Sequence, residues 1–316
     1  MAIPTLTLGD TGIEVSVLCL GTLNFGSRTD RDTSVTLLDA YAEAGGNFLD
    51  SANCYSYWVP GCAGGESEAL LGDWMRERGN RERLFIATKV FNEYPGAERG
   101  LSARQIETEC EKSLKRLQTD VIDLYYAHTD DREVPLVETL EAFDRLARAG
   151  KVRYLGASNF RAWRLERSRE VSRQHGWAPY CCVQQRYSYL RPKPGADFHP
   201  WTPPTTDDLL DFCRNNPVPL IAYSPLMKGA YDRADRAFPA EYTGPDADAR
   251  LAALRAVALK VGAKPTQVVL AWMLHSTPPV IPLFAASTVE QLQSNLQAVE
   301  VKLTAEQMER LNTAGA

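Results

Sequence analysis

The chain has 316 residues, of which 44% are hydrophobic, and 35 Lys and Arg against 40 Asp and Glu leave a net charge of −5. Such a modest charge argues against a nucleic-acid-binding surface and favours a small-molecule partner. The first residues lack the basic and apolar segments of a signal peptide, and no run of about 18 apolar residues occurs. The seven Cys are scattered and lie mostly in apolar runs, which predicts reduced core thiols. We therefore expect a cytoplasmic protein that binds neither nucleic acid nor a membrane.

The first expected element is a β-hairpin over residues 5–18, with Gly9, Asp10 and Gly12 in its turn. Eight short strands follow, each rich in apolar or β-branched residues and without clean alternation. This pattern is typical of parallel strands that are covered on both faces. The eight strands are expected to end at or near Gly21, Asp50, Lys89, His128, Ser158, Gln184, Tyr223 and Phe284.

Helix patterns lie between these strands and after the last one. Helices are expected over residues 102–117, 136–150 and 287–296, and from Thr304 onward. The first and the last of these open with Ser or Thr followed three residues later by Gln, which is a capping-box pattern. Alternation of eight strands with helices predicts an α/β fold, the (β/α)8 TIM barrel.

The expected architecture is one domain over residues 1–316, with the N-terminal β-hairpin and extra C-terminal helices added to the barrel. A doubly wound sheet is the alternative, but residues 21–26, GTLNFG, lack its glycine fingerprint after the first strand. Two long segments, residues 187–205 and 227–248, follow strand ends. In a barrel they would overhang the C-terminal mouth, where active sites are built.

Polar residues stand at the ends of three successive expected strands. Asp50, Lys89 and His128 occupy these ends, and Tyr55 lies in the loop after Asp50, so a barrel would bring all four together. A Tyr has a pKa of about 10 and acts as an acid near neutral pH only where positive charge favours its phenolate. Lys89 can supply that charge, with Asp50 as its counter-ion. His128 can donate a hydrogen bond to a carbonyl oxygen and so orient it toward the Tyr55 hydroxyl.

Motifs along nearly the whole chain resemble the motif series of the aldo-keto reductases, in the same order and at similar spacing. They are GNFLDSANCY, IATKV, DLYYAH, GASNF, IAYSPL and STVEQLQSNL. The resemblance implies an NAD(P)-dependent oxidoreductase, an aldo-keto reductase or alcohol dehydrogenase, that reduces an aldehyde or ketone or oxidises the alcohol. It also implies a catalytic tetrad of Asp50, Tyr55, Lys89 and His128, with Tyr55 as general acid/base during hydride transfer.

The resemblance implies a cofactor site at the same end of the barrel. Ser158, Asn159 and Gln184 correspond to the carboxamide site, and Tyr223 to the aromatic residue that stacks on the nicotinamide. Ser224 and Leu226 fall on pyrophosphate-loop positions, while Gln291 and Asn295 fall on adenosine positions. The full expected set of cofactor-binding residues is Thr22, Leu23, Asp50, Ser158, Asn159, Gln184, Tyr223, Ser224, Leu226, Lys228, Ser287, Gln291 and Asn295.

The choice between NADP and NAD depends on basic residues near the adenosine ribose. Members of the family usually grip the 2′-phosphate of NADPH with Arg or Lys after the last barrel strand, yet residues 280–301 contain neither. A phosphate without a basic partner loses its charge-assisted hydrogen bonds. NADP (NADPH) is the expected cofactor, with Lys228 contributing from another loop, and NAD is the alternative.

Several aromatic residues near the expected mouth either line a pocket or pack the loops. They are Tyr57, Trp58, Tyr94, Tyr187, Trp201 and Tyr231. Aromatic platforms beside polar groups suit a hydroxylated, sugar-like carbonyl substrate. The other three His, at 175, 199 and 275, have no metal-ligand spacing, and we expect no metal.

Two other functions fit parts of the pattern. A Lys at a barrel strand end also suits a Schiff-base aldolase or lyase with Lys89 as nucleophile. A non-catalytic redox sensor that binds the cofactor is the second, because the chain also resembles potassium-channel β-subunits. The long mouth segments and the complete tetrad favour turnover. The oligomeric state, the exact substrate and the physiological direction of reaction are left open.

Overall fold

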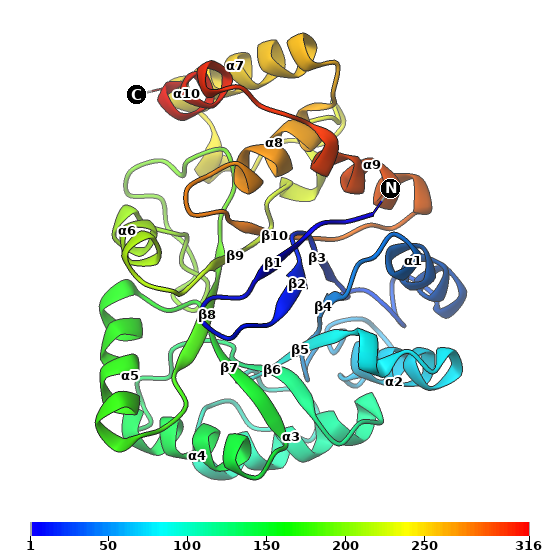
Figure 1. Cartoon of the computed structure of the whole chain (residues 1–316), viewed down its shortest axis with the longest axis vertical. Coiled ribbons are helices and arrows are strands. Elements are labelled where there is room, and N and C mark those ends of the chain that lie inside the picture. The colour runs from blue at the N-terminus through cyan, green and yellow to red at the C-terminus, as the bar shows by residue number, and fades with distance from the viewer. Residues whose placement is uncertain (1, 316) are drawn as a thin grey trace.

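Eight parallel strands close into a barrel in the computed structural model, which describes residues 2–315 (Figure 1). The strands are β3 (Cys19–Gly21), β4 (Phe48–Asp50), β5 (Phe85–Val90), β6 (Ile122–Ala127), β7 (Val152–Ser158), β8 (Tyr180–Arg186), β9 (Leu220–Tyr223) and β10 (Ile281–Phe284). Each strand pairs with the next in chain order, and β10 pairs with β3 to close the barrel. The prediction of a TIM barrel is confirmed.

The strand ends agree with the sequence prediction to within two residues. Five of them fall at the predicted residue, whereas β5 continues one residue past Lys89, β6 stops one residue before His128, and β8 continues two residues past Gln184. Every residue of β5 and β6 is buried, as expected for strands with the barrel interior on one face and helices on the other.

Ten helices surround the barrel within residues 2–315 (Figure 1). They are α1 (Arg31–Glu43), α2 (Glu66–Arg78), α3 (Ala103–Leu117), α4 (Leu136–Arg148), α5 (Ala162–His175), α6 (Asp207–Asn215), α7 (Pro245–Val261), α8 (Pro265–Leu274), α9 (Val289–Leu296) and α10 (Ala305–Thr313). The capping box predicted at Thr304 is complete. At α3 only half of it forms, because Ser102 accepts from the Gln105 N–H while the Gln105 side chain donates to the Glu98 carbonyl.

The N-terminal hairpin, formed by β1 (Thr5–Thr7) and β2 (Glu14–Ser16), lies across one end of the barrel (Figure 1). Its residues Leu8 and Val15 are fully buried in one apolar cluster with side chains of the barrel interior, among them Phe48 and Leu124. Gly9 in the turn has φ +57°, and a Cβ there would lie 2.6 Å from the Pro217 carbonyl oxygen. The hairpin therefore covers the N-terminal end of the strands, and the C-terminal end is left for a site.

The first long segment, residues 187–205, lies against the C-terminal end of the barrel as predicted. Its Trp201 carbonyl accepts a hydrogen bond from Thr129 Oγ1 at 3.0 Å, just after β6. The second segment is shorter than predicted, because α7 begins at Pro245; it contains the short 3-10 turns η2 (Met227–Gly229) and η3 (Ala240–Tyr242). The two segments meet where the Lys193 N–H donates to the Glu241 carbonyl at 2.8 Å.

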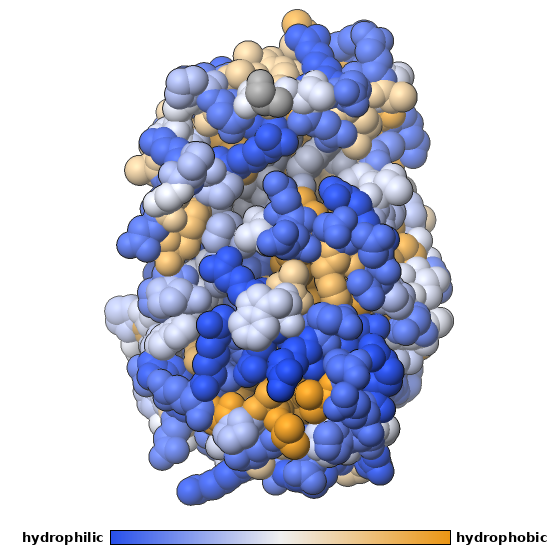
Figure 2. Space-filling model, turned by 90° about the vertical axis from the view of Figure 1, so that its left-hand side faces the viewer, coloured by the Kyte–Doolittle hydropathy of each residue, from blue (hydrophilic) through white to orange (hydrophobic). Residues whose placement is uncertain are grey.

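The surface on one side of the molecule is largely polar, and the cysteines lie mostly in the interior, as expected from the sequence. On the side of the molecule that carries α5 and α6, apolar side chains form small groups separated by polar and charged ones (Figure 2). All seven Cys are free thiols and six of them are buried, which confirms the prediction of reduced core thiols. Among residues 2–315, no helix has the length and apolar character needed to cross a membrane.

Candidate active site

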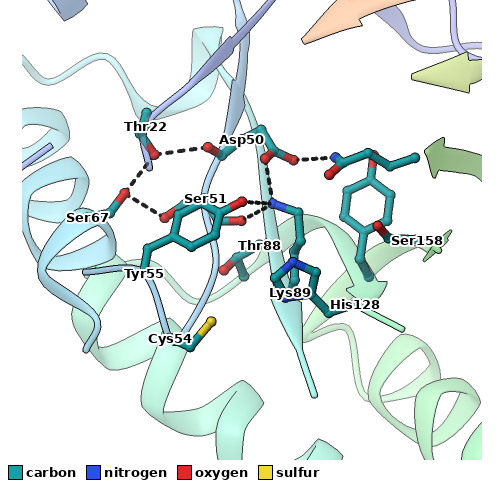
Figure 3. A network of polar contacts seen from close by, with 12 residues as sticks. Thr22, Asp50, Ser51, Cys54, Tyr55, Ser67, Thr88, Lys89, His128 and Ser158 are labelled. Carbon is teal, nitrogen blue, oxygen red and sulfur yellow. Dashed lines mark hydrogen bonds and ion pairs between the residues drawn. The ribbon is translucent and has the colours of Figure 1, made fainter. Parts of the chain in front are cut away.

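Lys89 is the centre of a buried polar cluster at the C-terminal end of the barrel (Figure 3). Its Nζ lies 2.5 Å from Asp50 Oδ1, 2.6 Å from the Ser51 carbonyl oxygen and 2.9 Å from Tyr55 Oη. A protonated Lys has three hydrogens, so all of them are donated. Three of the four predicted catalytic residues are thus joined through one ammonium group.

The strand pairing explains why these side chains meet. Asp50 lies opposite Ala87 in the β4–β5 pairing, and Lys89 is two residues further along β5. Because side chains alternate along a strand, Ala87 and Lys89 share the inward face. Thr88 between them points outward, where its hydroxyl donates to Glu68 on α2 at 2.5 Å. Lys89 therefore reaches the mouth from inside the barrel, next to the last residue of β4.

The electrostatics of Tyr55 differ from the prediction. Burial raises the pKa of the Tyr55 phenol well above its usual value, and the negative charge of Asp50 adds to the effect. The nearby Lys89 does not bring this pKa toward neutrality, because burial of the phenol is the largest influence on it. Burial also raises the pKa of Asp50, against the opposing charge and hydrogen bond of Lys89. In this structure Tyr55 is a phenol that holds its proton at neutral pH.

His128 lies immediately after β6 and beside Tyr55, with ring centroids 6.2 Å apart. Its backbone N–H donates to the Val90 carbonyl at 3.0 Å, and its backbone carbonyl accepts from Asn159 Nδ2 at 2.9 Å. Burial lowers the pKa of His128 well below its usual value, and the positive charge of Lys89 lowers it further. His128 is therefore a neutral imidazole at neutral pH, and all four predicted catalytic residues lie together.

The predicted carboxamide residues are hydrogen-bonded to this cluster. Gln184 Nε2 donates to Asp50 Oδ2 at 2.8 Å. Asn159, in the left-handed region with φ +60°, donates to Ser158 Oγ at 3.1 Å and accepts from the Tyr223 hydroxyl at 2.8 Å. Side-chain amides and hydroxyls thus gather beside a half-buried aromatic ring. This chemistry fits an aromatic ring that carries an amide, as nicotinamide does.

The other predicted cofactor residues lie at the same end of the barrel and differ in their exposure and in their hydrogen bonds. Thr22 is buried and donates to the Asp50 carbonyl at 2.9 Å, while Leu23 is 39% exposed. Ser224, Leu226 and Lys228 follow β9, and Lys228 forms no salt bridge within residues 2–315. Ser287, Gln291 and Asn295 follow β10; the Ser287 N–H donates to Gln291 Oε1 at 2.9 Å, and Asn295 is buried.

A second buried polar cluster, which the sequence analysis missed, holds the loop that carries Tyr55. Glu109 of α3 is fully buried, and its carboxylate accepts from Asn53 Nδ2 at 2.7 Å, from the Tyr94 hydroxyl at 2.6 Å and from Lys112 Nζ at 2.7 Å. Asn53 stands two residues before Tyr55. One signal was available: Glu109 lies between Ile106 and Cys110, on the apolar stripe of its helix.

The aromatic residues near the mouth divide into two groups. Tyr57 and Trp58 are each 40% exposed, and the Trp58 ring contacts Tyr55 at a centroid distance of 6.3 Å. Trp201 packs on Phe91 beside the mouth. The other three pack loops and helices: Tyr94 lies against Ala52 and Cys54 of the loop that carries Tyr55, Tyr187 packs on Trp272, and Tyr231 packs on Phe238.

The remaining histidines make local contacts. His175 stacks on Trp177, the His199 ring contacts Trp201, and His275 Nδ1 lies 2.8 Å from the Ala271 carbonyl oxygen. Over residues 2–315, no group of three or more His, Cys, Asp or Glu has the arrangement of a metal site.

The fold and the strand-end cluster define a TIM-barrel protein with a polar site at its C-terminal mouth, and comparison with known proteins shows that it is an oxidoreductase and gives its family. Residues 17–316 match the family model described as the Aldo/keto reductase family, and the chain belongs to that family. Aldo-keto reductases generally use NAD(P)H and act on small-molecule carbonyl substrates.

Individual relatives cover nearly the whole chain. It is 34% identical to an uncharacterized oxidoreductase, YrpG, of Bacillus subtilis, across 96% of this chain and 94% of that protein. It is 35% identical to norsolorinic acid reductase stcV of Emericella nidulans, across 94% of this chain and 77% of that protein. The crystal structure of the thermostable aldo-keto reductase Tm1743 with the inhibitor epalrestat matches with a TM-score of 0.77 and 31% identity, over 98% of both chains.

Proposed function

We propose that this protein reduces an aldehyde or ketone with NAD(P)H, or oxidises the corresponding alcohol, with Tyr55 as the general acid/base. The observation that carries the proposal is the 2.9 Å hydrogen bond from Lys89 Nζ to the buried Tyr55 hydroxyl. Reduction of a carbonyl group requires a hydride at carbon and a proton at oxygen. The nicotinamide, when bound, supplies the hydride. The chain must therefore supply the proton and hold the carbonyl in place.

Each of the four clustered residues has a role in that proton transfer. Tyr55 holds its proton at neutral pH and gives it to the carbonyl oxygen as negative charge develops there. The Lys89 ammonium, already hydrogen-bonded to the phenol, stabilises the phenolate that results. Asp50 keeps Lys89 charged and oriented. His128, as a neutral imidazole, donates a hydrogen bond to the same carbonyl oxygen. Alcohol oxidation uses the same groups in reverse.

The proposed cofactor site extends from this cluster across three strand ends. Ser158, Asn159 and Gln184 are proposed to hold the carboxamide. Gln184 donates to Asp50, and Asn159 donates to both Ser158 and the His128 carbonyl, so the three side chains lie beside the catalytic cluster. Tyr223 is proposed to cover one face of the nicotinamide. The remaining proposed cofactor residues are Thr22, Leu23, Ser224, Leu226, Lys228, Ser287, Gln291 and Asn295. We propose NADPH as the preferred cofactor and NADH as the alternative.

The geometry favours this reaction over a Schiff-base mechanism. A nucleophilic Lys needs a neutral amine with a free lone pair. Lys89 is fully buried, and its three hydrogens are donated to Asp50, Ser51 and Tyr55. Loss of its proton would leave Asp50 buried without a counter-ion. A redox sensor would use the same cofactor residues. Steady-state turnover measured against cofactor dissociation separates the two functions, and fast multiple turnover would make the sensor hypothesis unnecessary.

We propose a hydroxylated, sugar-like carbonyl compound as the substrate. Exposed Tyr57 and Trp58, together with Trp201, offer aromatic faces beside the polar cluster. Plain aromatic aldehydes are the comparison, because they share the carbonyl group and lack the hydroxyl groups. A panel of hydroxylated and plain aromatic aldehydes at equal concentration tests the proposal. Equal or better kcat/KM for the plain aromatic aldehydes would contradict it.

The variant Tyr55→Phe tests the proposed acid. We expect the turnover number to fall by about 10²- to 10⁴-fold, the usual contribution of general acid catalysis. Titration followed by nicotinamide fluorescence should give nearly unchanged Kd values for NADPH and NADH. Tyr154→Phe is the matched control, since it removes the same hydroxyl at the opposite end of the barrel, where that group donates to the Thr11 carbonyl of the hairpin, and its turnover should stay near that of the wild type. Near-normal turnover of Tyr55→Phe would remove Tyr55 as the acid.

A further inference from the structure

Asn92 lies beside the proposed catalytic residue His128 and is not itself one of the four residues of the proposed proton transfer. It follows β5 by two residues, and its Nδ2 lies 3.1 Å from His128 Nδ1. The same nitrogen lies 3.7 Å from Cys54 Sγ, in the loop that carries Tyr55. Asn92 thus contacts both segments that meet at the mouth next to β5.

The direction of this hydrogen bond decides where the imidazole proton lies. The nitrogen of a side-chain amide carries two hydrogens and does not accept hydrogen bonds, so His128 Nδ1 must be the acceptor. A neutral imidazole with an acceptor at Nδ1 carries its hydrogen on Nε2. The two contacts of Asn92 Nδ2 account for its two hydrogens, one directed to Nδ1 and one to the Cys54 sulfur.

Backbone hydrogen bonds hold His128, and the ionisable groups near its ring favour the neutral imidazole. The backbone of His128 is held on both sides by hydrogen bonds to Val90 and Asn159. The ionisable groups near the ring are Lys89, Tyr55 and Cys54. The first is a cation that disfavours an imidazolium, and the other two are neutral, because burial raises the pKa of Tyr55 well above its usual value and that of Cys54 to about 11. No carboxylate within residues 2–315 is hydrogen-bonded to the His128 ring.

We propose that Asn92 is a positioning residue which, by donating to Nδ1, holds neutral His128 in the tautomer with its hydrogen on Nε2. That hydrogen is then available to the carbonyl oxygen of a substrate. The catalytic value of this arrangement rests on the proposed carbonyl reduction, whereas the tautomer itself is a property of the folded protein alone. With the opposite tautomer, Nε2 would present a lone pair to the carbonyl oxygen and repel it.

The experiment measures the ¹⁵N chemical shifts of the His128 ring in the whole protein across pH, with His128→Gln used to assign the resonances. In the wild type we expect Nε2 to carry the hydrogen and Nδ1 to be unprotonated at neutral pH. Asn92→Asp, which replaces a donor by an acceptor of the same shape, should move the hydrogen to Nδ1 and raise the pKa of His128. Asn92→Leu, which has similar size and no hydrogen-bonding group, should give a mixture of tautomers.

Turnover gives the second measurement. Asn92→Asp should lower kcat by about 10-fold or more, with a changed pH profile, because His128 loses its role as a neutral donor. Cofactor Kd should stay near the wild-type value in both variants. A wild-type Nδ1–H tautomer, or ring shifts that are the same in all three proteins, would overturn the proposal. If the tautomer behaves as expected but no carbonyl compound is reduced, the proposed function fails and the role of Asn92 stands. If one variant does not fold, the other variant is compared with the wild type, and a wild-type hydrogen on Nδ1 overturns the proposal in either case.

Discussion

Asp50 Oδ1 and Lys89 Nζ lie 2.5 Å apart, and both side chains are at most 1% exposed. A buried ion pair contributes little net stability, because removal of both charges from water costs about as much as their attraction returns. Removal of one partner is different, since it leaves a buried charge alone. The main role of this ion pair is therefore to hold the Lys89 ammonium group next to Tyr55, and its contribution to stability is small.

Asp50→Asn tests this interpretation. We expect the free energy of unfolding to fall by about 3–5 kcal/mol, because Lys89 is left buried without a counter-ion, and turnover to be lost with it. Urea denaturation followed by circular dichroism measures the first effect. The double variant Asp50→Asn, Lys89→Met removes both charges and should recover most of the stability but none of the turnover. Equal destabilisation of the single and double variants would contradict the argument.

Glu109→Ala tests the cluster that holds the Tyr55 loop. The change removes the acceptor for two buried donors, Asn53 and Tyr94, each of which costs about 1–3 kcal/mol when left unsatisfied. We also expect kcat to fall more than KM changes, because the loop no longer holds Tyr55 firmly beside Lys89. Glu107→Ala on the same helix removes only an exposed pair with Arg145, and should cost less than about 1 kcal/mol. Similar losses for the two variants would show that burial of Glu109 has no special effect.

The barrel and the strand-end residues were predictable because parallel buried strands leave short apolar runs in a sequence. Asp50, Lys89 and His128 could be recognised by their place at the ends of such runs, and Tyr55 only through the loop that follows Asp50. Three of the eight strand ends differ from the prediction by one or two residues, since no local signal marks where pairing with the neighbouring strand stops.

The hydrogen-bond partners that position these residues could not be predicted from local sequence patterns. Asn53 and Glu109 are 56 residues apart, and Asn92 and His128 are 36 apart, so their pairing depends on the finished barrel. The pKa of Tyr55 was predicted in the wrong direction for a related reason. Sequence places Lys89 near the phenol but does not report how completely the barrel excludes water, and burial is the largest influence on that pKa.

As the pH drops below about 6.5, the protein should lose stability because of His128. Burial lowers the pKa of His128 in the folded state, so the unfolded chain binds a proton that the folded chain resists. Above about pH 6.5 the imidazole is neutral in both states and has no effect. As the pH falls below that value, stability is lost at up to about 1.4 kcal/mol per pH unit, until the folded pKa is reached.

Urea denaturation between pH 5 and 7.5, on the wild type and on His128→Gln, measures this effect. The glutamine variant has no proton to bind at this position, so its unfolding free energy should fall less steeply toward low pH. The other three His are present in both proteins and cancel in the comparison. Parallel curves for the two proteins would mean that His128 titrates normally in the folded state.

The proposed preference for NADPH depends on Lys228. Residues 280–301 contain no Lys or Arg, and Lys228 is exposed, at the C-terminal end of the barrel and without a salt bridge in residues 2–315. A hydrogen bond to a charged group contributes about 1.5–3 kcal/mol, which is roughly a 10- to 100-fold change in affinity. Lys228→Asn should therefore weaken NADPH binding by about that factor and leave NADH binding nearly unchanged. Asn is the chosen replacement because it tolerates the left-handed backbone found there, with φ +58°.

Fluorescence titration of the wild type and the variant with both cofactors separates three outcomes. A selective loss of NADPH affinity supports the proposed contact between Lys228 and the 2′-phosphate. An equal loss for NADPH and NADH would mean that Lys228 contacts the pyrophosphate shared by both. If the wild type binds NADH more tightly than NADPH, the lack of basic residues in 280–301 means that NAD is the cofactor. Arg233→Ala, which removes a nearby cation already paired with Asp235, is the matched control and should change neither affinity.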